Sequence, residues 1–308
     1  MNQMRILMAW ILCGVMAGCG PLMSAKQRHA VTVKETERVE SDYTGPKRRV
    51  AVIDFQNKTA YGQRLGDVAT DILITELGKS KKFILVERDK MNRLLEEQKL
   101  GMSGVIDPST AARAGKLLGV NAIVTGSVSQ FGTKTEGSDY LITKTKRQIV
   151  EAVVDIRVVD VETGQILYTD SGKGIVKRST GKFLGMGTKA GYDETLEGEA
   201  LRNAIVKFTQ NIIYQINAKP WSCRVAQVDK SNIYLNAGFE SGLKVGTRLT
   251  VYHLGQEIID PTTGISMGNV EDEIAEIEVI RHFGEDGSVA KIIKGSRPST
   301  NDICRLAE

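Results

Sequence analysis

From about residue 47, the spacing of hydrophobic residues alternates between the pattern of a strand and the pattern of a helix. KRRVAVIDFQ (47–56) has four contiguous apolar residues at 50–53, which predicts a buried strand. Residues 65–77 then place apolar side chains at helical spacing, and Gly78 is expected to end that helix. The next predicted elements are a strand at 82–88, a polar helix at 89–100, a helix from Pro108 to Gly119, and a strand at 120–131.

The period changes after residue 150. EAVVDIRVVDVETGQILYTDSG (151–172) predicts two strands joined by a turn at 162–165. Residues 174–194 are rich in glycine and are expected to be irregular. A stripe of apolar residues over 201–216 predicts a long helix that ends before Pro220.

Beyond Pro220 the chain shows short strand patterns separated by turn formers. These patterns are SCRVAQVD, NIYLNAG, TRLTVYHL, EIAEIEVIRHF and GSVAKIIKG, and they predict a small β-barrel or sandwich over 219–308. The expected fold class is therefore α/β over 47–218, an open sheet flanked by helices with candidate membrane β-hairpins, plus a small all-β C-terminal domain.

The start of the chain resembles a targeting signal. Residues 6–17 are almost wholly apolar and follow Arg5, a run too short for the ~20 residues of a membrane-spanning helix but typical of a secretory signal. The run ends in Met-Ala-Gly-Cys (16–19), which resembles the lipobox of bacterial lipoproteins, although Met16 replaces the usual Leu. The resemblance implies cleavage after Gly18 and acylation of Cys19. Residues 1–18 are then a signal peptide and 19–46 a flexible tether.

The net charge bears on nucleic-acid binding, and the cysteines bear on disulfide formation. The formal net charge is +4, without the concentrated basic stripe of a nucleic-acid-binding protein, so no nucleic-acid partner is expected. Cys223 and Cys304 stand near the two ends of the predicted β domain. In an oxidising compartment they are a candidate disulfide, and two separate buried thiols are the alternative.

Catalytic and metal-binding patterns are weak. His29, His253 and His282 lack a neighbouring nucleophile motif, and no CxxC or HxxxH spacing is present. Residues 185–190 fit GxGxxA without a suitable βαβ unit, and 179–183 lack the Ser or Thr of a P-loop. We therefore expect no enzyme activity, no metal and no cofactor.

Several stretches together resemble the curli-secretion-channel (CsgG-type) family. They are VAVIDFQNKT, KFILVERDKMNRLLEEQKL, LLGVNAIVTGSVSQF, DIRVVDVETGQIL and LRNAIVKF, in that order over 47–218. The resemblance implies an outer-membrane lipoprotein with an α/β domain facing the periplasm. It also implies a homo-oligomeric ring in which two hairpins per subunit, here about 130–153 and 172–196, build a membrane β-barrel that exports secreted proteins.

Residues 217–253 resemble instead the C-terminal domain of flagellar assembly protein T. The shared feature is a strand followed by NAG and GLKVGTRLTVY. Gly238, Gly242 and Gly246 are expected to occupy tight turns with positive φ. This resemblance implies an appended module for interaction with envelope proteins.

The candidate membrane hairpins have only a mild apolar pattern. One alternating face of 140–150 also carries Arg147, which costs ~2–4 kcal/mol at a bilayer midplane. Neither face of 174–188 is apolar throughout. The candidate residues of the membrane hairpins are Leu141, Thr143, Thr145, Phe183, Leu184 and Met186. Two hypotheses stay open: a ring that exports or assembles a surface polymer such as curli-like fibres, and a non-channel periplasmic scaffold for another envelope machine.

Overall fold

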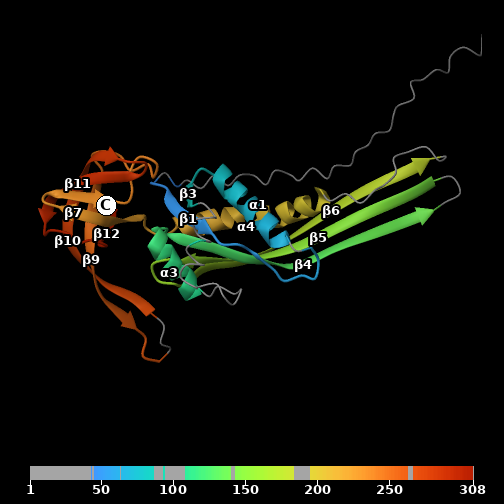
Figure 1. The fold of residues 1–308 in the computed structure, drawn as a ribbon, viewed down its shortest axis with the longest axis horizontal. Coiled ribbons are helices and arrows are strands. Elements are labelled where there is room, and N and C mark those ends of the chain that lie inside the picture. Colours follow the sequence, from blue (N-terminus) through green and yellow to red (C-terminus); the bar gives the residue numbers. More distant parts are fainter. Residues whose placement is uncertain are drawn as a thin grey trace, which may run out of the picture. The chain divides into compact units, whose positions relative to one another are not determined.

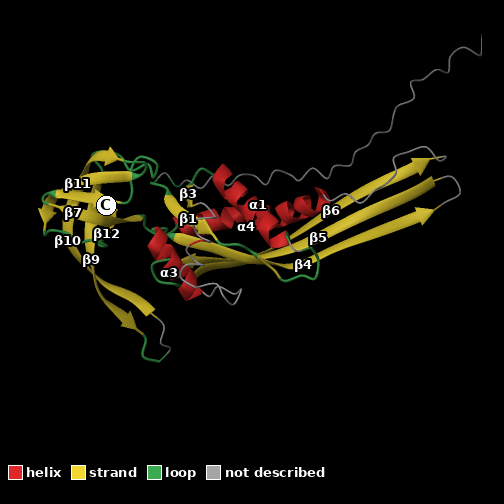
Figure 2. Cartoon of the chain, in the orientation of Figure 1, coloured by secondary structure: helices red, strands yellow, loops and turns green. Residues whose placement is uncertain are grey.

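A computed structural model gives a mixed α/β region followed by a closed barrel (Figures 1 and 2). The structure describes Tyr43 and residues 45–62, 64–86, 93, 108–139, 143–183, 195–262 and 266–307. These residues belong to one compact unit. The predicted fold class is confirmed, and the β region is a barrel. The proposed domain limits at 47–218 and 219–308 stay predictions.

The mixed sheet has the strand order β3-β1-β4-β5-β6. β1 pairs in parallel with β3 and β4, and β4, β5 and β6 are antiparallel neighbours. The short β2 pairs with β4. The strand bounds are β1 Arg48–Val52, β2 Gln56–Asn57, β3 Phe83–Val86, β4 Ala122–Asp139, β5 Thr143–Asp160 and β6 Ile166–Phe183.

Two strands are longer than the sequence predicts. β4 continues past residue 131 to Asp139, and β6 continues to Phe183 through glycine-rich sequence that was expected to be irregular. β5 pairs with β4 from Asp160 to Lys144 and with β6 from Val159 to Thr143, each with one register shift. The cross-strand hydrogen bonds to β5 override the weak local preference of this sequence for strand, because strand propensity depends on the neighbouring strand more than on the residue alone.

Three helices are described: α1 Leu65–Lys79, α3 Pro108–Leu118 and α4 Thr195–Asn217. α1 does not end at Gly78 as predicted. It runs to Lys79, and the Ser80 hydroxyl donates to the Leu77 carbonyl at 2.6 Å. Gly119 ends α3 as predicted, with φ of 64°. Of the predicted polar helix at 89–100, only Arg93 lies among the described residues. No described helix is long and apolar enough to cross a membrane.

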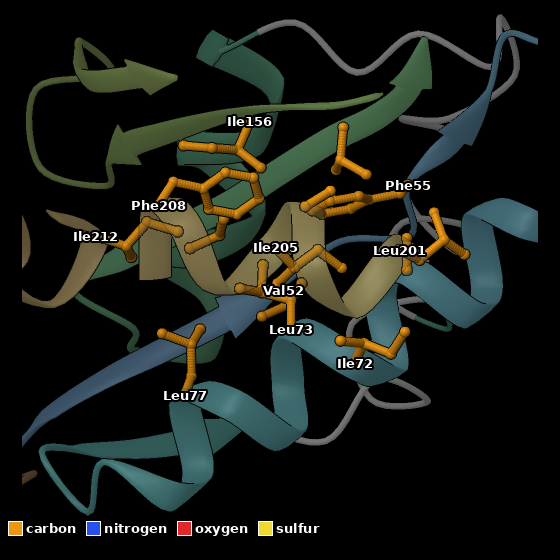
Figure 3. Packing of buried hydrophobic residues seen from close by; sticks show 14 of the residues in the cluster. Val52, Phe55, Ile72, Leu73, Leu77, Ile156, Leu201, Ile205, Phe208 and Ile212 are labelled. Carbon is orange, nitrogen blue, oxygen red and sulfur yellow. The ribbon is translucent and has the colours of Figure 1, made fainter. Parts of the chain in front are cut away.

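α1 and α4 bury one face of the mixed sheet. The α4 stripe of Leu201, Ile205, Phe208 and Ile212 is fully buried, and Figure 3 shows it facing α1 and the sheet. On β5, alternate residues from Val150 to Val158 join the same core. This alternation arises because successive side chains of a strand point to opposite faces.

The C-terminal barrel closes in the order β10-β11-β8-β7-β12-β9. Gly242 and Gly246 have the predicted positive φ values, 78° and 86°. Gly238 does not, and it is needed for space: a Cβ there would lie 2.4 Å from the Gly287 carbonyl oxygen. The strands are β7 Ser222–Asp229, β8 Asn232–Leu235, β9 Arg248–Ile259, β10 Ser266–Phe283, β11 Gly287–Gly295 and β12 Ile303–Leu306.

Candidate functional site: the strand extension and the barrel junction

The predicted site residues divide between described and undescribed parts of the chain. Gly18, Cys19, Leu141, Leu184 and Met186 lie outside the described residues, so cleavage, lipidation and half of the membrane-hairpin set stay predictions. Thr143, Thr145 and Phe183 belong to β5 and β6. The register pairs Thr143 with Phe183, which places both at the same end of the sheet.

β4, β5 and β6 continue side by side beyond the part of the sheet that the helices cover, as Figure 1 shows. Among the β5 residues whose burial the structure describes, Val150 is the last fully buried one along this direction, and it pairs with Thr133 and Val176. We call residues 133–139, 143–150 and 176–183 the strand extension. The seven residues 133–139 span about 24 Å along the strand, which the ~35–45° tilt of strands in a membrane barrel reduces to roughly 17–20 Å of the ~25 Å apolar band.

Basic side chains occupy both faces of the strand extension. Residues directly opposite each other share a face, so Lys134, Ile149 and Lys177 lie on one face together with Arg147. Lys146 lies on the other face, and all four basic side chains are exposed. The register therefore confirms the pattern read from the sequence: neither face is continuously apolar.

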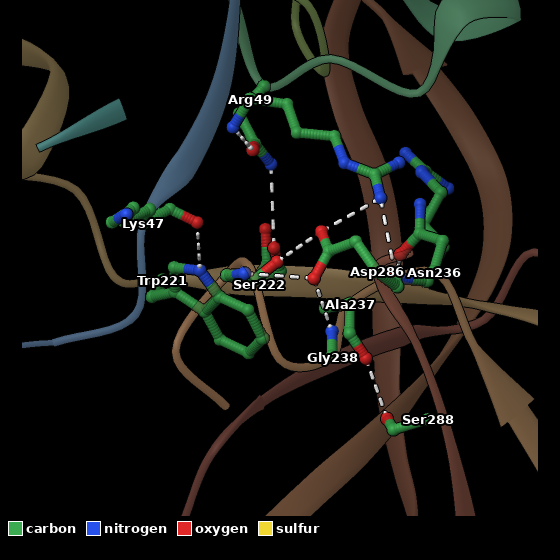
Figure 4. A network of polar contacts seen from close by, with 12 residues as sticks. Lys47, Arg49, Trp221, Ser222, Asn236, Ala237, Gly238, Asp286 and Ser288 are labelled. Carbon is green, nitrogen blue, oxygen red and sulfur yellow. Dashed lines mark hydrogen bonds and ion pairs between the residues drawn. The ribbon is translucent and has the colours of Figure 1, made fainter. Parts of the chain in front are cut away.

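The second candidate site is the junction where the start of β1 meets the barrel. Figure 4 shows a polar network there. The Trp221 indole Nε1 donates to the Lys47 carbonyl at 3.2 Å, and the Lys47 amide donates to the Ser241 carbonyl at 2.6 Å. Asn121, the residue before β4, accepts from the Arg49 amide at 2.9 Å and donates to the Ser222 carbonyl at 3.4 Å.

Asp286 is the centre of this network. Its carboxylate accepts from the amides of Gly238 and Ser241, both at 2.8 Å, and from the Ser241 hydroxyl at 2.5 Å. It also pairs with the Arg49 guanidinium at 2.9 Å while only 6% exposed. A nearly buried carboxylate with this many donors holds the β10–β11 turn to both the β8–β9 loop and β1.

Sequence reasoning did not identify the junction residues. Asp286 falls in the predicted turn 284–287, and aspartate is common in turns. Arg49 opens a predicted strand beside two other basic residues. Nothing local in the sequence indicates that these two side chains, 237 positions apart, form an ion pair.

Cys223 and Cys304 are free thiols in the structure, and both are buried in the barrel core. They lie directly opposite each other on the antiparallel strands β7 and β12. Opposed residues have Cα atoms about 4.5–5.5 Å apart, within the range that a disulfide spans. The candidate disulfide therefore stays a prediction that the geometry permits.

The sequence model of the family described as "Curli production assembly/transport component CsgG" matches residues 32–237. The chain belongs to this family. Among curated relatives, a Neisseria meningitidis serogroup B protein named as a candidate lipoprotein is 28% identical over 217 residues, covering 67% of this chain and 91% of that one. A Salmonella typhimurium protein that carries the same name as the family is 26% identical over 267 residues, covering 79% of this chain and 91% of that one.

A solved lipoprotein structure resembles part of this chain. The crystal structure of lipoprotein GNA1162 from Neisseria meningitidis matches 56% of this chain and 99% of its own, at 11% identity and a TM-score of 0.32. A likeness at this level carries no argument about function. The family is named for components of curli production, assembly and transport.

Proposed function

We propose that this protein is an outer-membrane lipoprotein whose subunits form a ring that exports or helps assemble a surface polymer. Family membership supports this class of function. The observation that carries the ring is the strand extension. Among the described residues, the outer part of β4 pairs only with β5, and so does the outer part of β6. A neighbouring subunit offering the complementary edge would satisfy the backbone groups at both edges.

Ring closure through these edges would join the extensions into one continuous sheet. Closed sheets leave no unpaired backbone group, which is the condition for strands to cross a bilayer. In this proposal Cys19 carries the lipid anchor, the helix-covered sheet forms the periplasmic ring, and the extension faces the membrane.

Cys19→Ser tests the anchor. Without acyl chains, a ring whose strands do not insert should leave the outer-membrane fraction and appear in the soluble periplasmic fraction, because the lipid would be its main attachment. A control substitution in the tether, Ser24→Ala, should leave the protein membrane-bound. If Cys19→Ser stays in the membrane fraction, attachment comes from inserted strands instead.

A second candidate function is a non-channel scaffold that docks another envelope machine. The basic side chains on both faces of the extension favour it, because a lipid-facing Lys or Arg costs ~2–4 kcal/mol at the bilayer midplane. Lys146 is exposed on one face and Arg147 on the other. In a membrane barrel, one of the two would have to lie near an interface.

Planar-bilayer conductance separates the two functions. The acylated protein extracted from outer membranes is compared with Lys146→Glu and Arg147→Glu, a matched pair of neighbours on opposite faces. If a channel forms, reversing the charge that lines the lumen should shift ion selectivity, and its neighbour should change selectivity little. A folded, oligomeric sample without conductance steps would contradict the channel and favour the scaffold.

A further inference from the structure

A cavity of about 140 Å³ lies at the barrel junction. It is lined by the start of β1, the turn after β5 and the start of the barrel, including Arg48, Glu162 and Trp221. Lys47 and Lys116 also line it and are exposed, so it opens to solvent. In volume it corresponds to on the order of ten water molecules.

The lining is strongly basic. It holds seven basic and two acidic side chains. Three of the basic side chains already pair with carboxylates: Arg49 with Asp286, Lys219 with Asp160, and Arg305 with Glu271. Within the described part of the chain, no ion pair joins Lys47, Arg48, Lys116 or Arg224 to an acidic residue. Glu162 is the one carboxylate of the lining outside these pairs.

Two polar atoms of the lining are buried without a hydrogen-bond partner among the described residues. One is Nε of Arg48, a residue only 4% exposed, and the other is Oε1 of Glu162. Arg48 Nη2 donates to the Lys219 carbonyl, so the guanidinium is held through a different N–H from the one that lacks a partner. Burial lowers the pKa of Arg48, and the nearby Tyr43 and Glu162 oppose this shift. A buried donor without a partner destabilises the protein, and more so when it is charged.

We propose that the cavity binds a small oxyanion that keeps one hydroxyl group, of the hydrogenphosphate type. An anionic oxygen would accept from Arg48 Nε–H, and the excess of basic side chains would balance its charge. The hydroxyl would donate to Glu162 Oε1, which could not accept anything from a fully deprotonated oxyanion. The pair of unused atoms, one donor and one acceptor, thus selects the protonation state of the ligand as well as its charge.

The test compares phosphate with sulfate at pH 7 and constant ionic strength, because phosphate keeps a proton there and sulfate does not. Trp221 lines the cavity and is the one tryptophan beyond the predicted signal peptide, so its fluorescence reports binding. The full-length acylated protein in detergent should bind phosphate saturably and about tenfold or more tighter than sulfate, the difference that one hydrogen bond to a charged group supplies.

Variants separate the two contacts. Arg48→Met should weaken phosphate binding by about tenfold or more, since it removes a charge-assisted hydrogen bond. Glu162→Gln should abolish the preference for phosphate, because the new amide can donate to sulfate. Lys116→Ala should weaken both anions alike, and Lys244→Ala, an exposed barrel residue outside the lining, should change neither.

Several results would overturn the proposal. The first is that phosphate does not bind saturably, and the second is that the unmodified protein binds phosphate and sulfate equally. The third is that the Glu162→Gln variant still prefers phosphate over sulfate. Because the sulfate comparison and Lys116→Ala leave Arg48 in place, they decide the matter even if Arg48→Met fails to fold. Glycerol phosphate at pH 5.5 distinguishes the source: tighter binding than inorganic phosphate indicates a phosphorylated headgroup, and weaker binding indicates the free anion.

Discussion

Replacing Gly174 by alanine should separate α4 from the sheet that it covers. A Cβ at Gly174 would lie 1.9 Å from the Ala200 carbonyl oxygen, and one at Gly172 would lie 2.0 Å from the Ala204 carbonyl oxygen. These two glycines of β6 therefore let the backbone of α4 rest directly on the strand. Both obstructing atoms belong to helix backbone, which cannot rotate away as a side chain could.

The cost follows from how far α4 must move. Real Cβ atoms essentially never approach a heavy atom within 3.0 Å, so the helix must retreat by more than 1 Å near Ala200. A radial gap of ~0.5–1 Å forfeits a quarter to a half of each dispersion contact along the α4 stripe. Overpacking of this kind costs about 1–3 kcal/mol, and the rigid backbone favours the upper end. For a chain of this size, ~3 kcal/mol corresponds to a fall in Tm of roughly 6–12 °C.

Thermal unfolding followed by far-ultraviolet circular dichroism measures the effect on the acylated protein in detergent. The matched control is Gly132→Ala on β4, where a new Cβ would meet nothing within 4 Å. Its Tm should change little, as for most exposed substitutions. If Gly174→Ala and Gly132→Ala melt at the same temperature, α4 does not rest on β6 at Gly174 and the packing argument is wrong.

Two further predictions concern the barrel. Asp286→Ala should lower the free energy of unfolding by about 2–4 kcal/mol in a denaturant titration, because it leaves the amides of Gly238 and Ser241 without an acceptor and removes the partner of Arg49. The control is Glu285→Ala at the exposed neighbouring position, which should lower it by less than ~0.5 kcal/mol. Equal losses in the two variants would refute the role of Asp286. Protein exported to the periplasm should carry a Cys223–Cys304 disulfide, seen as two hydrogen masses lost in intact-mass spectra and regained on reduction. In the reduced protein the hydrogen bond to Cys223 and burial raise the pKa of the Cys304 thiol. Its alkylation should therefore need a higher pH than that of an exposed thiol, and rapid labelling at neutral pH would contradict this environment.

The sequence by itself determined the elements whose signal is local. β7 and β11 begin and end where strand patterns and turn formers predict, and the apolar stripe of α4 lies in the core as its period requires. α3 ends at Gly119 because glycine adopts the left-handed conformation easily. Such signals are readable because period, caps and turn residues act within a few positions of the chain.

Only the tertiary structure decided the rest. The outer half of β6 is a strand because β5 offers it a complete set of hydrogen-bond partners, although its own sequence has little preference for strand. Gly238 is needed for space beside Gly287, which no local turn pattern reveals. The junction ion pair and the basic cavity join residues from opposite ends of the chain. These features depend on which segments pack together, and local hydrophobic periodicity does not record contacts between residues so far apart in sequence.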